Sequence, residues 1–130
     1  KEAGGNMDRV SSIRNSCKID ILSGDDSLTI PMMSLGARGV VSVASNIIPA
    51  EMVRMTHAAL NGKWDEAQSI HAHYFNLFRD LFIESNPGPV KAAMAMLGWI
   101  EETYRLPLCE ISAANRAKLA DTLRKTGVLQ

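Results

Sequence analysis

Two short runs rich in branched apolar residues constrain the fold of this chain more than any other feature of its sequence. Residues 19–23 read Ile-Asp-Ile-Leu-Ser and are followed by Gly24-Asp25-Asp26. Residues 39–43 read Gly-Val-Val-Ser-Val and are followed by Ala44-Ser45-Asn46. Short apolar runs that end in polar loops are typical of buried strands.

A helical stretch joins the two runs. Asp26 or Ser27 can cap a short helix over residues 29–35, and Gly36 can end it. Residues 7–15 form a further helical candidate. Strand, helix and strand in this order are typical of a βαβ unit. We therefore predict an α/β fold with a parallel sheet that is covered on both faces.

From about residue 63 onward the apolar residues recur at helical spacing instead. A long amphipathic helix is predicted from residue 64 to about 83, before Asn86-Pro87-Gly88-Pro89 breaks it. Two more helices are predicted from their terminal residues, Pro89 to Gly98 and Ser112 to Gly127. The patterns thus predict two units, with strands and helices of a parallel sheet in residues 1–62 and a helical domain in residues 63–130.

The charge balance limits the classes of partner. The chain has 14 Lys and Arg against 14 Asp and Glu, so it lacks the positive field that holds nucleic acid or an anionic membrane. No window approaches the roughly 18 apolar residues of a membrane span, and no basic and apolar leader is seen. We expect a cytoplasmic protein that binds neither nucleic acid nor membrane.

Metal and disulfide chemistry find little support. Cys17 and Cys109 are far apart and have no zinc-ligand spacing, so we expect two small buried side chains. His71 and His73 stand two residues apart on a predicted helix, where side chains face different directions. We therefore predict no metal site.

Lys1 is the first candidate for chemistry, although a lysine is ordinarily a solvated surface residue. It precedes Glu2-Ala3-Gly4-Gly5-Asn6, which reads as the loop after a strand. Sites in parallel α/β proteins are built at that end of the strands. A lysine amine held there away from water becomes neutral more easily and can attack a carbonyl.

The ends of the two predicted strands supply the other candidates. Gly24 lacks a Cβ atom, so a small ligand can lie against its backbone. Asp25 and Asp26 follow, and a capping or loop-stabilising role suits Asp26. Val41 lies on the second run, where an apolar side chain and a free carbonyl can line a pocket for a small keto acid, or where the side chain simply packs inside a barrel.

These segments together resemble the dihydrodipicolinate synthase family of the N-acetylneuraminate lyase superfamily. The resemblance rests on Lys1-Glu2-Ala3-Gly4-Gly5-Asn6, Leu22-Ser23-Gly24-Asp25-Asp26, residues 39–46, residues 86–91 and Leu106-Pro107, in the order and spacing of the family. It implies the C-terminal portion of a (β/α)8 TIM barrel followed by a C-terminal helical domain. Lys1 would then end the sixth strand, Gly24 the seventh, and Val41 would lie on the eighth.

The resemblance also implies a reaction. Lys1 matches the lysine that forms a Schiff base with pyruvate, and the resulting enamine attacks L-aspartate 4-semialdehyde. The product is 4-hydroxy-tetrahydrodipicolinate, an intermediate of lysine (diaminopimelate) biosynthesis. Val41 matches a pyruvate contact, Gly24 the pocket glycine, and Asp25 the adjacent loop. No cofactor is implied, because the protonated imine is the electron sink.

Two strands cannot close a barrel of about 250 residues. We therefore expect this chain to be one piece of a longer protein, without the family's remaining active-site residues and inactive by itself. The family implies a homotetramer built as a dimer of dimers.

Two alternatives remain open. Another pyruvate-dependent aldolase, such as N-acetylneuraminate lyase or a 2-keto-3-deoxy sugar acid aldolase, would keep Lys1 and change the second substrate. A non-catalytic interaction module would instead use the helices of residues 63–130.

Overall fold

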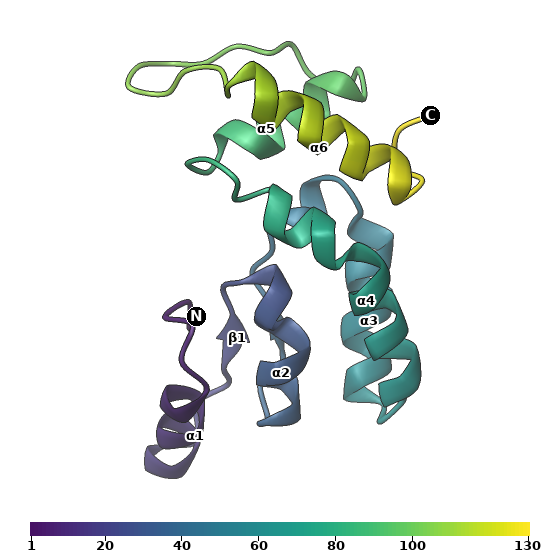
Figure 1. Cartoon of the computed structure of the whole chain (residues 1–130). Helices are drawn as coiled ribbons and strands as arrows, with labels where there is room; N and C mark the ends of the chain where they lie inside the picture. Colours follow the sequence, from purple (N-terminus) through teal and green to yellow (C-terminus); the bar gives the residue numbers. More distant parts are fainter.

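The computed structural model describes residues 1–130 and contains two short strands and six α-helices. In chain order the elements are α1 (Met7–Ser16), β1 (Leu22–Ser23), η1 (Asp26–Leu28), α2 (Thr29–Ser34), β2 (Gly39–Val40), η2 (Ala44–Asn46), α3 (Pro49–Leu60), α4 (Trp64–Asp80), α5 (Gly88–Met96) and α6 (Ala113–Lys125). Figure 1 shows α3 and α4 side by side, with α5 and α6 together at one end of the molecule.

The predicted βαβ unit is present. β1 and β2 pair in parallel with Leu22 opposite Gly39 and Ser23 opposite Val40. Glu2 forms a further parallel bridge with Ser23 on the other side of β1. Three chain segments therefore run the same way, in the order residue 2, β1, β2.

Both strands are shorter than predicted. Ile19 is 60% exposed and has no neighbouring strand, and β1 begins only at Leu22. The ladder extends by one bond at each end, from the Arg38 amide to the Ile21 carbonyl (2.8 Å) and from the Val41 amide to the Ser23 carbonyl (2.8 Å). A strand persists only where a partner satisfies its backbone groups, which an apolar run alone does not reveal.

The helix predictions hold better, although the predicted cap by Asp26 or Ser27 is wrong, because Leu28 precedes α2 with no side-chain cap bond, and α4 ends at Asp80 rather than near residue 83. Capping residues do mark the later helix ends. The Ser112 hydroxyl accepts a bond from the Asn115 amide at the start of α6 (3.3 Å), and Gly127 follows its end with φ 72°. Gly98 has the same φ after α5. A positive φ suits glycine, which has no Cβ to clash.

Helix α3 fills a stretch for which the sequence patterns predicted no particular element. Pro49 stands at its first turn, and Met52, Met55 and Ala59 are buried at helical spacing. Helix α3 packs against α4, and only residues 61–63 join the two helices. The predicted division at residue 62 therefore falls in the turn between two packed helices, and the division itself stays a prediction.

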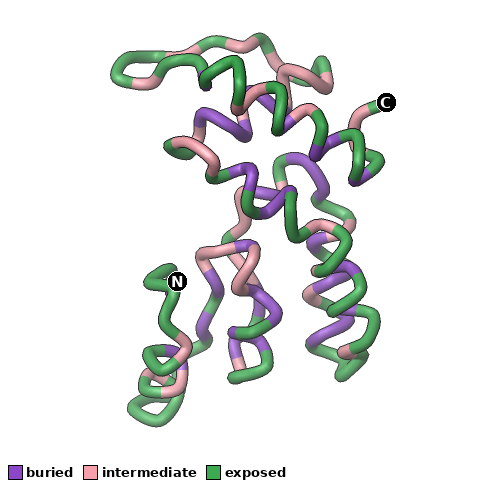
Figure 2. The backbone as a smooth tube through the Cα atoms, viewed as in Figure 1, coloured by how far each residue is buried: buried purple, intermediate pink, exposed green.

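One continuous core connects the elements. It includes Val10 of α1, Met32 of α2, Met55 of α3, Leu77 of α4 and Leu119 of α6. The loop between α5 and α6 is mostly exposed or half-buried, as Figure 2 shows. None of the helices is long and apolar enough to cross a membrane.

Candidate functional site

The predicted site residues adjoin the paired positions of the three parallel segments, and the Lys1 side chain reaches the end of β1 from the residue before its bridge. Lys1 directly precedes Glu2, Gly24 directly follows β1, and Val41 directly follows β2. Parallel strands present their carboxyl ends at the same edge of a sheet, which is where α/β proteins bind ligands.

Lys1 lies across Gly24. A Cβ atom built on Gly24 would meet Lys1 Cε at 2.5 Å and the Ala3 Cβ also at 2.5 Å. The Gly24 amide donates to the Glu2 carbonyl (2.7 Å), which fixes the two segments together. Position 24 therefore needs glycine because the Ala3 Cβ and the lysine side chain together occupy the space where any other residue would place its Cβ.

Val41 stands one strand further along. Its amide donates to the Ser23 carbonyl (2.8 Å), whereas no hydrogen bond within the chain ends on its own carbonyl oxygen. The Val41 side chain is 48% exposed. An apolar surface and an available acceptor thus lie beside the Lys1 and Gly24 pair.

The two aspartates differ in their surroundings. Asp25 is half-buried, and its carboxylate makes no hydrogen bond or ion pair within the chain. Asp26 is 2% exposed, and its Oδ2 accepts bonds from the amides of Val43 (3.1 Å) and Ala44 (2.9 Å). Burial raises the pKa of Asp26, and the hydrogen bonds to its carboxylate offset part of that rise.

An open cavity of about 400 Å³ adjoins the loop after β1. Asp25 and Asp26 line one side, and Phe78, Arg79 and Phe82 near the end of α4 line the other. The lining therefore combines acidic, basic and aromatic residues around a volume in the range of small-ligand sites.

Other sequence expectations need revision. Lys1 is exposed, so the described residues do not supply the burial of its amine that its position suggested. The prediction that Cys17 and Cys109 are buried is wrong, because both are exposed. Cys17 follows the end of α1 and Cys109 lies in the loop before α6, where no second layer covers them.

His71 and His73 face different neighbours. His73 Nε2 lies 3.4 Å from the Thr126 carbonyl, whereas His71 contacts the rings of Phe75 and Phe78 with centroids 5.7 and 5.9 Å away. Burial lowers the pKa of His71. No group of three or more His, Cys, Asp or Glu side chains could hold a metal ion.

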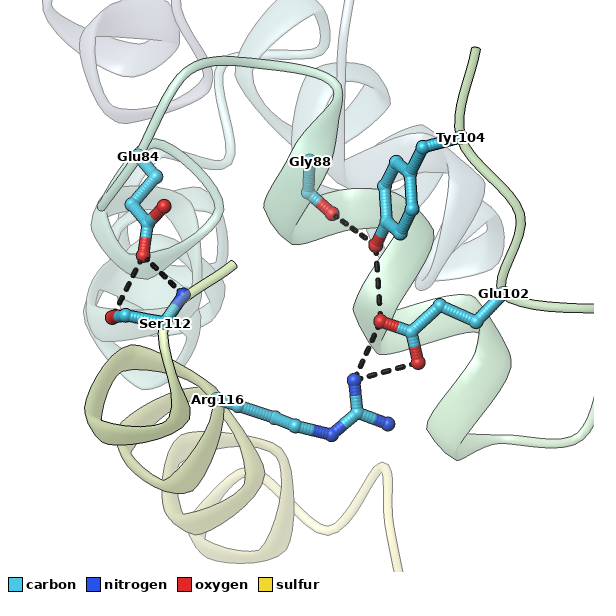
Figure 3. Close-up of polar contacts among 6 residues, drawn as sticks. All are labelled: Glu84, Gly88, Glu102, Tyr104, Ser112 and Arg116. Atoms are coloured by element: carbon cyan, nitrogen blue, oxygen red, sulfur yellow. Dashed lines mark hydrogen bonds and ion pairs between the residues drawn. The ribbon is translucent and has the colours of Figure 1, made fainter. Parts of the chain in front are cut away.

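A second polar cluster holds the last helices together (Figure 3). Glu84 Oε1 accepts bonds from the amide and the hydroxyl of Ser112, both 2.9 Å, at the start of α6. Glu102 accepts from Arg116 (2.6 Å) and from the Tyr104 hydroxyl (3.0 Å). Arg116 holds the pKa of Glu102 below its usual value, and burial with this carboxylate raises the pKa of Tyr104 to about 12. The cluster fixes the α5–α6 loop and lies away from the strand ends.

Sequence reasoning missed two residues of the strand-end site. Glu2 is buried, and its Oε1 accepts from the Gly4 amide (2.7 Å), which shapes the loop after Lys1. Ser23 is fully buried, and its hydroxyl donates to the Asp25 carbonyl (2.8 Å). A glutamate and a serine at strand ends carry no distinctive sequence signal.

Parallel strands, an intervening helix and a lysine laid across a strand-end glycine define part of an α/β protein with a site at the carboxyl edge of its sheet. The comparisons with known proteins agree. The family model described as the dihydrodipicolinate synthetase family matches residues 1–126. This chain belongs to that family.

Curated relatives are similar over the whole chain. A 4-hydroxy-tetrahydrodipicolinate synthase of Methanococcus maripaludis strain C7 is 49% identical over 130 residues, covering 100% of this chain and 45% of the relative. The enzyme of that name from Aquifex aeolicus is 51% identical over 127 residues, covering 96% and 43%. The chain thus spans less than half the length of these relatives.

Solved structures agree in fold. The crystal structure of dihydrodipicolinate synthase from Aquifex aeolicus superposes with a TM-score of 0.96 at 49% identity, covering 98% of this chain and 44% of that one. The chloride-inhibited Acinetobacter baumannii enzyme, complexed with pyruvate, gives 0.95 at 34% identity, covering 99% and 45%. The α/β fold is therefore that of a part of the family's barrel protein.

The prediction that this chain is the C-terminal part of a family member does not stand and is corrected. The family match runs over residues 1–126 of the chain, and about 45% of each relative is covered. These matches identify the family and the share of its length, and they do not place the chain at the C-terminal end. The chain corresponds to part of a family member.

Proposed function

We propose that this chain works as part of a 4-hydroxy-tetrahydrodipicolinate synthase, a Schiff-base lyase that condenses pyruvate with L-aspartate 4-semialdehyde in lysine biosynthesis. The observation that carries the proposal is the Lys1 side chain lying across Gly24, one strand away from Val41. The names of the relatives support the same reaction.

In this proposal the Lys1 Nζ, once neutral, attacks the keto carbon of pyruvate. The carbinolamine loses water to give a protonated imine, and loss of a methyl proton gives the enamine. The enamine carbon then forms a bond to the aldehyde carbon of the second substrate. Ring closure through the substrate amine finally releases Lys1 and the cyclic product.

Neighbouring groups have distinct roles in the proposal. Gly24 leaves room for the three-carbon acid beside the lysine stem, and the Val41 carbonyl is available to accept a hydrogen bond from the carbinolamine hydroxyl or the imine N–H. Asp25 lines the adjoining cavity with an unpaired carboxylate, which suits the ammonium group of the second substrate.

Borohydride trapping tests the proposal. The full-length protein that contains this chain is incubated with pyruvate, reduced and digested, and we expect the reduced pyruvate adduct on Lys1 by mass spectrometry. The variant Lys1→Arg keeps the charge but forms no imine and should lose the adduct, whereas Lys18→Arg, at an exposed site, should keep it. An unmodified Lys1 in the folded wild-type protein would refute the proposal.

The choice of aldehyde separates this synthase from related aldolases. Product formation with L-aspartate 4-semialdehyde, and none with N-acetylmannosamine or sugar-derived aldehydes, is the expected result. Membership of an enzyme family argues against the non-catalytic interaction module.

We also propose a cytoplasmic homotetramer, which the strongly exposed Trp99 and Leu106 side chains support as candidates for subunit contacts.

A further inference from the structure

Asp26 makes contacts that the reaction proposed above does not use. Its carboxylate is buried to 2% exposure, yet Oδ1 has no hydrogen-bond partner. Its Oδ2 accepts bonds from the amides of Val43 and Ala44, 17 and 18 residues further along the chain. The Ser42 side chain of the same loop also lies near the carboxylate and, like the two amides, lowers the pKa of Asp26. Burying a carboxylate oxygen without a hydrogen-bond partner costs free energy of folding.

The contacts of Asp26 close a small ring between two loops. At one end of the ring the Val41 amide donates to the Ser23 carbonyl (2.8 Å), which is the last bond of the strand pair. At the other end the Asp26 carboxylate holds Val43 and Ala44. Gly24 lies on one side of this ring and Val41 on the other, so the ring sets their separation.

Both sides of the ring are tightened locally. The Ser23 hydroxyl donates to the Asp25 carbonyl (2.8 Å) and accepts from the Asp25 amide (3.1 Å). The Ser45 amide donates to the Ser42 hydroxyl (2.8 Å) on the opposite side. The carboxylate bridge is thus a second contact, besides the bond from the Val41 amide to the Ser23 carbonyl, that fixes one loop against the other.

We propose that Asp26 is a positioning residue: its carboxylate holds the loop after β2, and with it Val41, at a fixed place relative to the glycine across which Lys1 lies. The inference rests on the proposed Schiff-base function. Asp26 acts on pyruvate only through Val41 and Gly24, in contrast to the neighbouring Asp25, whose carboxylate is free.

The test measures how much pyruvate is needed for half-maximal borohydride trapping on Lys1 in the full-length protein. Asp26→Ala removes the bridge and should raise this concentration about tenfold or more, because small displacements of positioning groups weaken reactions strongly. Asp26→Asn keeps an oxygen that accepts both amides, so it should stay within about threefold of the wild type.

Asp80 supplies the matched control. It is also a buried carboxylate, 5% exposed, but it faces α6 through Thr122 and Lys118. Asp80→Ala should lower the melting temperature and leave the pyruvate requirement unchanged. If Asp80→Ala raises that requirement as much as Asp26→Ala does, the effect is one of general stability and the proposal is overturned.

A second variant covers the case in which Asp26→Ala does not fold. Asp26→Glu keeps the charge and the acceptor oxygens but lengthens the bridge by one methylene. This variant should fold and still need more pyruvate for half-maximal trapping. An unchanged pyruvate concentration would overturn the proposal. Wild-type protein that traps no pyruvate on Lys1 instead refutes the proposed function. Trapping that is normal in the wild type and equally normal in Asp26→Ala refutes only the role of Asp26.

Discussion

At the scale of single residues, the strand-end site depends on one missing side chain. Gly24 leaves open the space that Lys1 occupies, and a Cβ atom at this position would lie 2.5 Å from both Lys1 Cε and Ala3 Cβ. The lysine end is flexible, but the Ala3 Cβ is attached directly to the backbone of the loop. A side chain at position 24 must therefore shift the loop that carries Ala3 as well as displace the lysine from its place over the strand end.

We expect Gly24→Ala to reduce the rate of Lys1 trapping by pyruvate by about tenfold or more, because the amine leaves its reacting position. This rate would be measured at a fixed pyruvate concentration by quenching samples with borohydride at successive times. Gly62→Ala is the control. A Cβ atom added to Gly62 would meet no atom within 4 Å, but the backbone there has φ 75°. This variant should therefore lower the free energy of unfolding by about 1 kcal/mol and leave the trapping rate unchanged. Equal trapping rates for Gly24→Ala and the wild type would contradict the assigned role of Gly24.

At the scale of elements, a buried contact attaches α6 to α4. The Thr122 hydroxyl donates to Asp80 Oδ2 (2.6 Å), and Lys118 Nζ lies 3.2 Å from Asp80 Oδ1. Lys118 is half-exposed, so its ion pair is screened by water. The hydroxyl bond is buried and should matter more for holding the two helices together.

Thr122→Val should lower the free energy of unfolding by about 1–3 kcal/mol, because it keeps the side-chain shape and leaves a buried carboxylate oxygen without its donor. Urea denaturation measures the change. Thr103→Val, at an exposed position whose hydroxyl makes no bond within the chain, should have almost no effect. If Thr122→Val changed the free energy of unfolding as little as Thr103→Val, the hydroxyl bond would not stabilise the α4–α6 contact.

At the scale of the whole molecule, the α3 and α4 pair connects the βαβ unit to the last two helices (Figure 1). His71 lies on α4 between aromatic rings, and its Nδ1 is buried without a hydrogen-bond partner. Burial lowers the pKa of His71 from its ordinary 6.5, so the folded protein binds a proton there less readily than the unfolded chain.

The stabilising contribution of neutral His71 should therefore be present above about pH 6.5 and be lost as the pH falls through its lowered pKa in the folded state. Melting temperatures between pH 7.5 and 5 would show the decline. His71→Phe should flatten it, whereas His57→Gln, at an exposed site, should leave it intact. If the melting temperature of His71→Phe fell with pH as much as that of the wild type, other groups would cause the pH effect.

Local sequence features predicted most of the helices and the site edge. Ser112, Gly98 and Gly127 mark helix ends through their own backbone preferences, so they could be identified from sequence. Helix α3 was not singled out, although Pro49 and the spacing of its buried methionines were available signals. The exposed cysteines were mispredicted because residue type alone does not say which surface a second layer covers.

The sequence by itself determined the βαβ order, the helix ends and the residues at the strand ends, because these depend on neighbours within a few positions. Only the tertiary structure decided that Lys1 lies across Gly24, that Glu2 bridges Ser23, and that Asp26 joins two loops. Each of these contacts links segments about 17 or more residues apart. Such contacts form only when the packed core brings distant segments together, so patterns within a few residues cannot predict them.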